Sequence, residues 1–309
     1  MASVIQPDTI DFGAYLEATD SAHKVRPASE FVDAVIARLY GQTETKGAML
    51  PWFKTHGQFR VRPGEVSIWT GWNSHRKSMA LGQVVLGLCA QSEKTVIASM
   101  EMKPEATLAR MARQASGGEE PAIQFIRKFH LWTDGRLWLY NHLGQIAWQK
   151  MVAVCRYCID HLQIKHIVID SLMKCGIRED DYNGQKDFID ALCVVARDND
   201  AHIHIVAHSK KGQDEDTPPG KMDAKGTGTM TDLVDNVIVV WANKKKEREK
   251  TKPQPRADVI SQPDQLLIVE KQRHAEFEGR IALWFHERSL QFLESEGRQP
   301  QDYVDGWVT

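Results

Sequence analysis

The residues best suited to chemistry in this chain form one octet, Gly71-Trp72-Asn73-Ser74-His75-Arg76-Lys77-Ser78. An apolar run at 66–70 precedes it and a helix-like stretch at 79–90 follows, so the predicted order is strand, loop, helix. That order, ending in Lys-Ser, is typical of a P-loop. Glycine allows the sharp turn, backbone N–H groups surround phosphate oxygens, lysine reaches the β- and γ-phosphates, and the serine hydroxyl holds Mg²⁺. We therefore expect residues 71–78 to bind ATP or another NTP with Mg²⁺.

The octet departs from the P-loop pattern at one position, where Arg76 stands in place of glycine. A side chain there could crowd the phosphates, because glycine is used where a Cβ would interfere. Alternatively, the loop tolerates the Cβ, and the guanidinium points to solvent or contacts a phosphate. A chance Gly…Lys-Ser match at a strand–helix junction is the third interpretation.

Three further candidates end predicted strands, where the crevice of an open α/β sheet lies. Asp170 follows the apolar residues 166–169 and is the expected acid that acts on Mg²⁺ with Ser78. Glu101 closes the strand predicted at 95–102 and could be the general base for the attacking water. His208 closes 202–208 and could sense the γ-phosphate. The alternatives are a capping or surface carboxylate for Glu101, a plain strand-end residue for His208, and a metal cluster with His202 and His204.

Composition fits a globular chain without a strong charge bias. Of 309 residues, 42% are hydrophobic and 26% charged, with a net charge of −2, so binding of nucleic acid over the whole surface is not expected. A local basic channel is compatible with these values. The start of the chain is polar and no long apolar run occurs, which predicts a cytoplasmic protein. The five cysteines include Cys155 and Cys158 in a helical run, where core packing is favoured over metal or redox use.

Helices and strands alternate between residues 66 and 241, which predicts an α/β fold: a mostly parallel sheet flanked by helices. Residues 265–293 predict an antiparallel C-terminal extension. We divide the chain into an N-terminal arm and linker helix at 1–56 and an ATPase domain at 57–309. The linker helix, expected at 29–41, packs either on its own domain or on a neighbouring subunit. Residues 244–253 are too polar to pack, so we expect a solvated loop there, or a nucleic-acid contact.

Taken together, several segments resemble the RecA-type ring helicase domain of the DnaB family, most of all the helicase half of phage primase-helicases and of the mitochondrial Twinkle helicase. The resemblance covers about three quarters of the chain, in family order. The segments that carry it are 71–78, 98–101, 169–171, 206–208, 225–228, 235–237 and 271–273.

The resemblance implies a RecA-like P-loop NTPase core and an ATP-dependent replicative DNA helicase. Such a helicase would form a hexameric ring with ATP between subunits and move 5′ to 3′ on single-stranded DNA. Lys77 would stabilise the phosphates during hydrolysis, Glu101 would be the base and His208 the sensor. Lys271 and Arg273 would reach the ATP site of the adjacent subunit, Arg273 as the arginine finger.

In the same way, the resemblance assigns single-stranded DNA to a mobile channel loop, with part of a second loop at 183–186. The DNA-binding candidates of the first loop are Lys210, Lys211, Lys225, Gly226 and Thr227. A separate primase and a DNA polymerase are further implied partners, in the host cytoplasm if the chain is phage-encoded. The alternative is a catalytically weak ring that binds ATP and single-stranded DNA as a replication or recombination accessory. A small-molecule kinase is the third possibility.

Overall fold

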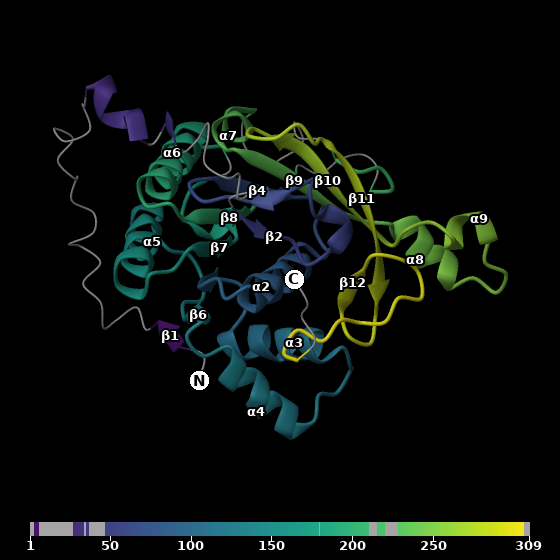
Figure 1. The fold of residues 1–309 in the computed structure, drawn as a ribbon. Helices are drawn as coiled ribbons and strands as arrows, with labels where there is room; N and C mark the ends of the chain where they lie inside the picture. Colours follow the sequence, from purple (N-terminus) through teal and green to yellow (C-terminus); the bar gives the residue numbers. More distant parts are fainter. Residues whose placement is uncertain are drawn as a thin grey trace.

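A ten-stranded sheet forms the centre of the computed structural model (Figure 1), which describes residues 3–5, 27–33, 35–36, 47–178, 180–209, 215–219 and 228–305. Its strand order is β1-β6-β5-β7-β8-β4-β9-β10-β11-β12. Neighbours from β1 to β9 pair in parallel, whereas β10, β11 and β12 add antiparallel strands at one side. A mostly parallel sheet with an antiparallel C-terminal extension was the predicted fold class, and it is confirmed.

The strands of this sheet are β1 (Ser3–Ile5), β4 (Val66–Thr70), β5 (Thr95–Ser99), β6 (Leu137–Tyr140), β7 (His166–Asp170), β8 (His202–Val206), β9 (Asn236–Ala242), β10 (Gln265–Gln272), β11 (Gly279–His286) and β12 (Gln291–Leu293). A separate hairpin consists of β2 (Ala48–Met49) and β3 (Arg60–Val61). The α-helices are α2 (Lys77–Ala90), α3 (Pro104–Ser116), α4 (Ile123–Trp132), α5 (Trp148–Leu162), α6 (Tyr182–Asp198), α7 (Gly228–Leu233), α8 (Lys244–Lys250) and α9 (Ala257–Ile260). Short 3-10 helices are η4 (Ala28–Phe31), η5 (Phe53–Thr55) and η6 (Leu172–Lys174).

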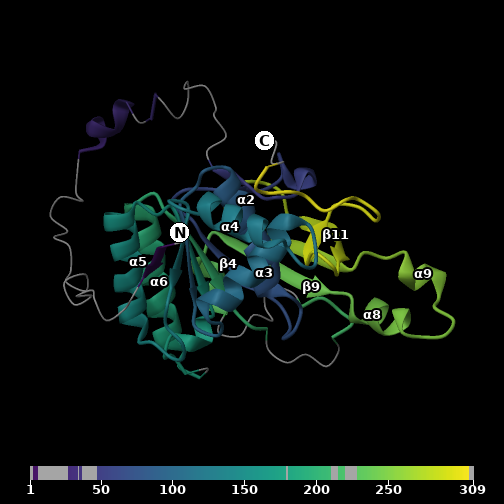
Figure 2. The ribbon, with the colours of Figure 1, turned by 90° about the horizontal axis from the view of Figure 1, so that it is seen from below.

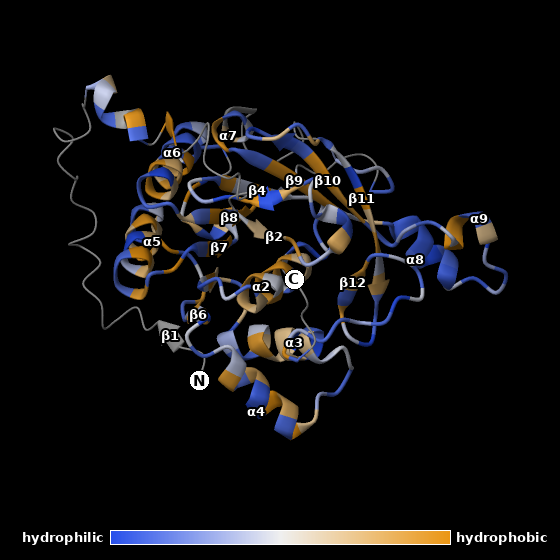
Figure 3. Cartoon of the chain, viewed as in Figure 1, coloured by the Kyte–Doolittle hydropathy of each residue, from blue (hydrophilic) through white to orange (hydrophobic). Residues whose placement is uncertain are grey.

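Helices cover both faces of the sheet, as expected for buried parallel strands. Figure 2 shows α5 and α6 on one side and α2, α3 and α4 on the other. Each layer has its own hydrophobic cluster, the first around α5 and α6 and the second around α2 and the C-terminal strands. Apolar helix faces turn towards the strands (Figure 3). Cys155 and Cys158 are fully buried in the first cluster, which confirms their predicted role in core packing.

The strand register explains why the candidate residues can meet. Ser99 of β5 lies opposite Asp170 of β7, and Trp69 of β4 lies opposite Val206 of β8. Each parallel strand therefore ends at the same edge of the sheet, and the loops that follow share that edge.

Residues 244–250 are a helix and not the solvated loop that their composition predicted. Lys246 and Glu249 are buried, and the Lys246 ammonium lies 3.1 Å from Oδ1 of Asp264. The Asn243 side chain also accepts a hydrogen bond from the Lys246 N–H, which caps the helix. The buried charge of Lys246 thus has a charged partner within the protein. Helices α8 and α9 project from the body together (Figures 1 and 2).

The structure differs from the sequence prediction at two helices, α6 and α4. Residues 183–186 lie in the first turn of α6, so they do not form a second channel loop; Asp181 caps this helix through the N–H of Gly184. Helix α4 was not predicted at all. Three of its exposed side chains are large and apolar, namely those of Ile123, Ile126 and Leu131.

The N-terminal region is described only in part. Residues 3–5 pair with β6 as an edge strand, and residues 28–36 are helical where described, within the range of the predicted linker helix. Val32, Val35 and Ile36 of that helix are exposed. The domain boundary at residue 57 stays a prediction, although Leu50 and Trp52 already belong to the core. Within the described part of the chain, no helix has the length and apolarity to cross a membrane.

Candidate nucleotide-binding site

Gly71 places the start of the octet against strand β9. Its φ angle is +148°, and a Cβ built there would lie 2.2 Å from the carbonyl oxygen of Val240. Both the backbone conformation and the close approach therefore require glycine. This explains why a glycine stands where the chain leaves β4.

Lys77 opens α2 and turns back over the loop. Its ammonium donates to the carbonyl oxygens of Gly71 (2.9 Å) and Trp72 (2.8 Å). Burial lowers the pKa of Lys77 to about 8, against the opposing effect of Asp170 and Glu101. The charge therefore sits inside the loop, where phosphate oxygens could replace the two carbonyls as its partners.

The backbone of the loop adopts the left-handed conformation at two positions. Ser74 and Arg76 both have φ of 63° in the left-handed region, a conformation that turns successive N–H groups to one side. Among the backbone hydrogen bonds described for residues 71–80, the donors are His75, Met79 and Ala80. The N–H groups at 73–74 and 76–78 make none of these bonds, so they are available to phosphate oxygens.

The Arg76 side chain leaves the loop and contacts two other elements. Nη2 donates to Oε1 of Glu247 in α8 at 2.6 Å, and the guanidinium carbon lies 4.0 Å from the ring centroid of Phe285 in β11. Its backbone carbonyl accepts from Met79 and Ala80 and so starts α2. A left-handed conformation costs an L-residue roughly 1–2 kcal/mol. Of the two interpretations of Arg76, these contacts favour a tolerated side chain directed away from the phosphates.

His75 attaches the loop to strands β9 and β10. The ring is fully buried, Nδ1 accepts from the N–H of Ala242 (3.1 Å), and the carbonyl accepts from Nε2 of Gln265 (3.2 Å). Burial, with the nearby positive charges of Lys244 and Lys77, lowers the pKa of His75 to about 4. A neutral ring is required, since only the deprotonated Nδ1 can accept that bond.

Asp170 and Ser78 form the candidate Mg²⁺ pair. Asp170 ends β7, is 9% exposed, and accepts a hydrogen bond from the Ser78 hydroxyl. Burial raises the pKa of Asp170, opposed in part by this hydrogen bond. A carboxylate and a hydroxyl beside the phosphate loop are oxygen ligands of the kind Mg²⁺ prefers, so the residues fit the ion. No group of three or more His, Cys, Asp or Glu elsewhere in the described ranges could hold a metal.

Glu101 lies next to this pair. It follows β5 and is exposed, and Oε1 accepts from the Ser171 hydroxyl at 3.0 Å. Ser171 is fully buried and follows Asp170 directly, through a cis peptide bond. The structure therefore brings together Lys77, Ser78, Glu101 and Asp170, as the sequence predicted.

Arg110 of α3 is a neighbour of the site that sequence reasoning missed. Its Nη2 donates to the Ser78 carbonyl at 3.3 Å, and its charge lowers the pKa of Asp170. Burial lowers the pKa of Arg110 itself. A sequence signal existed, because position 110 falls on the same helical face as Thr107, Met111 and Gln114, which are buried.

His208 also lies at this edge of the sheet. Its neighbours extend the β4–β8 pairing: Ala207 N–H donates to Trp69 O (3.0 Å) and Ser209 N–H to Gly71 O (3.1 Å). His208 is therefore level with Thr70, immediately before the loop. His202 and His204 are far along the strand and fully buried, with ring centroids 4.4 Å apart. Burial lowers the pKa of both rings.

Lys271 and Arg273 lie near the amino-terminal ends of the parallel strands, whereas residues 71–78 of the same chain follow the carboxyl end of β4. Gln272 pairs with Asn236, which pairs with Ser67 at the start of β4, whereas the P-loop follows its end. The Lys271 ammonium donates to three carbonyls around the end of α7, those of Thr231, Asp232 and Val234, each at 2.8 Å. Arg273 pairs with Asp235 at 3.1 Å and also donates to carbonyls of this turn. Both side chains therefore lie away from residues 71–78 of their own chain.

The DNA-binding candidates fall outside the described residues: Lys210, Lys211, Lys225, Gly226 and Thr227. A short described piece between them contacts the P-loop region, because Nε1 of Trp72 donates to the carbonyl of Thr217 at 3.0 Å. Nε1 of Trp241 likewise donates to the carbonyl of Glu215 at 3.0 Å. The described residues 215–219 are thus attached beside the octet.

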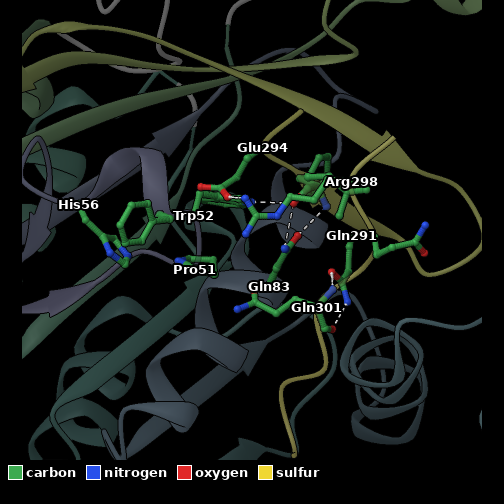
Figure 4. Close-up of a pocket in the computed structure, with 12 residues that line it drawn as sticks. Pro51, Trp52, His56, Gln83, Gln291, Glu294, Arg298 and Gln301 are labelled. Carbon is green, nitrogen blue, oxygen red and sulfur yellow. Dashed lines mark hydrogen bonds and ion pairs between the residues drawn. The ribbon is translucent and has the colours of Figure 1, made fainter. Parts of the chain in front are cut away.

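A separate pocket of about 110 Å³ lies between residues 51–56, α2 and the C-terminal segment (Figure 4). Two of its amides, those of Gln83 and Gln291, already have partners. Gln83 donates to the Phe292 carbonyl (3.1 Å) and the Tyr303 hydroxyl (2.9 Å), and Gln291 donates to the carbonyls of Gln114 and Gln301. The hydrogen bonds around this pocket attach the C-terminal segment to the core. We assign no ligand to the pocket.

Comparison with solved structures shows which known proteins have a similar fold. No protein-family model matches the chain. One solved structure, described as an ATPase domain, is similar with a TM-score of 0.71 and 13% identity, covering 88% of this chain and 100% of that one. A DnaB-like replicative helicase, solved to describe its interactions with primase, gives a TM-score of 0.70 and 12% identity over 88% of this chain and 69% of that one. The predicted resemblance to DnaB-type helicase domains is confirmed at the level of the fold.

Proposed function

We propose that this protein is an ATP-dependent DNA helicase that works as a ring and hydrolyses ATP between subunits. The observation that carries the proposal is the meeting of Lys77, Ser78, Glu101 and Asp170 at one edge of a DnaB-like sheet. These four residues come from three separate strand ends, so their meeting is a property of the fold and not of one motif. The likeness in fold to replicative helicase domains supports the choice among P-loop activities.

Each residue has a chemical role in this proposal. The N–H groups of the octet and the Lys77 ammonium hold the phosphates, and Ser78 and Asp170 hold Mg²⁺. When bound, Mg²⁺ neutralises charge that develops on the transferred phosphoryl group. Glu101 orients and deprotonates the attacking water, and Ser171 holds the carboxylate in place through the 3.0 Å bond to Oε1. His208, level with Thr70, senses the γ-phosphate.

The position of Arg273 supports hydrolysis in trans. It lies at the end of the sheet away from its own P-loop, so in this proposal it acts on the ATP site of a second copy. An arginine finger of this kind accelerates phosphoryl transfer by roughly a thousandfold or more. Lys271 lies beside it on the same turn.

Two exposed apolar faces support assembly. The helix at 28–36 exposes Val32, Val35 and Ile36, at 50–55% of their surface, and α4 exposes Ile123 and Leu131 at 67% and 72%. Faces of this kind on a monomer mark interaction sites. In our proposal the linker helix of one copy covers α4 of the next, in a hexamer.

Single-stranded DNA is the proposed polymer substrate, held in the central channel by Lys210, Lys211, Lys225, Gly226 and Thr227. The contact between Trp72 and Thr217 supports a link from the nucleotide to this segment. We further propose that the ring moves 5′ to 3′ and works with a separate primase and a DNA polymerase. The compartment would be the cytoplasm of a phage-infected host. The weak accessory ring loses its main argument, because the Arg76 side chain points towards Glu247 and Phe285.

Phosphate release from Mg-ATP, with and without single-stranded DNA, tests the proposal. We expect DNA to accelerate release by the wild-type protein. Glu101→Gln should retain ATP binding and lose turnover about a thousandfold, as expected when the general base is removed. Glu105→Gln, an exposed carboxylate in the first turn of α3, is the matched control and should leave turnover unchanged. Turnover that DNA does not change, or that survives Glu101→Gln, would reject the helicase proposal.

A further inference from the structure

The arginine in the phosphate loop depends on side chains that are distant in sequence. Arg76 caps α2 with φ 63° and ψ 26°, a left-handed conformation that glycine adopts freely and that an L-residue adopts only when other contacts compensate. The backbone N–H groups of Arg76 and of the residues that follow can converge on a phosphate only while this conformation persists. The structure must therefore contain something that holds it.

Two contacts fix the guanidinium on one side of the loop. Glu247 of α8 accepts from Nη2 at 2.6 Å, and Phe285 of β11 lies beneath the guanidinium at 4.0 Å. Glu247 is itself oriented, because its second oxygen accepts from the Lys244 ammonium at 2.7 Å. The Arg76 side chain is only 18% exposed, so the pair is partly shielded from solvent and stronger than a surface ion pair.

We propose that Glu247 and Phe285 are positioning residues of the nucleotide site: they hold the Arg76 side chain clear of the phosphates and keep its backbone in the conformation that binds them. This inference rests on the proposed function, since it assumes that the octet binds a nucleotide. It assigns a role to α8, which projects from the body beside the loop (Figure 2). It also explains how a loop with arginine in place of glycine can remain a binding loop.

The test is a double-mutant cycle in which binding of Mg-ATP is titrated and steady-state hydrolysis is measured. Glu247→Gln should weaken nucleotide binding about fivefold and raise KM by the same factor while kcat stays close to the wild-type value. Glu247→Asp, which keeps the charge, should recover part of the loss. Phe285→Leu should act in the same direction, because the ring no longer supports the guanidinium.

The decisive arm is the Arg76→Gly background, where the left-handed conformation no longer needs support. There, Glu247→Gln should change the affinity by less than a factor of two, since its effect passes through Arg76. Asp258→Asn is the matched control: it removes an exposed ion pair with Arg256 in the same projecting region and should leave binding unchanged.

Three results would overturn the inference. Tighter nucleotide binding by Glu247→Gln would mean that the released guanidinium helps to hold phosphate. An equal loss in the Arg76→Gly background would mean that Glu247 serves the fold in general, and wild-type affinity in Glu247→Gln would mean that the pair has no role. A wild-type protein that binds no nucleotide would instead reject the proposed function itself, so the two failures are distinguishable.

Discussion

Replacing Gly71 with alanine should separate the P-loop from strand β9. The added Cβ would lie 2.2 Å from the carbonyl oxygen of Val240, whereas a relaxed carbon–oxygen contact is about 3.3 Å. The loop or β9 must therefore shift by about 1 Å. The obstacle is backbone, so rotation of a side chain cannot relieve it, and a φ of +148° adds strain for any L-residue.

The size of the effect follows from these two terms. Overpacking costs about 1–3 kcal/mol, and alanine at a positive φ adds on the order of 1 kcal/mol, so the free energy of unfolding should fall by about 2–4 kcal/mol. Misplacement of a binding loop by about 1 Å can cost roughly a hundredfold. We therefore expect the affinity for Mg-ATP to fall by about that factor in a calorimetric titration of the folded variant.

Gly135→Ala is the matched control for this experiment. Gly135 also has a positive φ, of +70°, but a Cβ there meets nothing within 4 Å. It should show the strain without the collision, and therefore a smaller loss of stability in urea with unchanged nucleotide affinity. If Gly71→Ala binds Mg-ATP as tightly as this control does, the assignment of residues 71–78 as the phosphate loop is wrong.

Two further predictions concern the charge of the loop and the assembly of the ring. Because phosphates bind the protonated form of Lys77, and burial lowers its pKa to about 8, affinity should fall as pH rises through this value. At pH 9 about one tenth of the nucleotide-free protein keeps the charge, so the dissociation constant should be about tenfold higher than at pH 7; a flat profile would contradict the assignment. Leu131→Asp should prevent assembly in sedimentation velocity, since Leu131 is 72% exposed on α4. Gln124→Asp on the same helix should assemble normally, and rings formed by Leu131→Asp would exclude α4 from the interface.

Local sequence was sufficient for the parts of the site that depend on order along the chain. The strand, the octet and the helix follow one another, and Asp170 and Glu101 end apolar runs, so parallel pairing alone brings them to one edge. The cysteines in α5 were also placed correctly, since helical spacing directs them to the core.

The remaining features depend on contacts between distant residues. Arg76 and Glu247 are 171 positions apart, and nothing in the octet indicates that an acid from α8 will meet it. Composition misled at 244–250, because Lys246 reads as a solvated charge until Asp264 is seen beside it at 3.1 Å. Arg110 illustrates the same difficulty, since its contact with the Ser78 carbonyl depends on how α3 packs on α2.

The most direct test of hydrolysis between subunits is a mixing experiment with two inactive variants. Lys77→Ala removes the phosphate lysine and keeps the finger, whereas Arg273→Ala removes the finger and keeps the phosphate loop. In an equal random mixture, about a quarter of the interfaces would join an intact Lys77 to an intact Arg273 of the neighbour. We expect each variant alone to release almost no phosphate and the mixture to recover DNA-stimulated release. Two results would contradict the claim that a second copy of this chain completes the site. One is a mixture that forms mixed rings but releases no phosphate, and the other is full activity of Arg273→Ala alone.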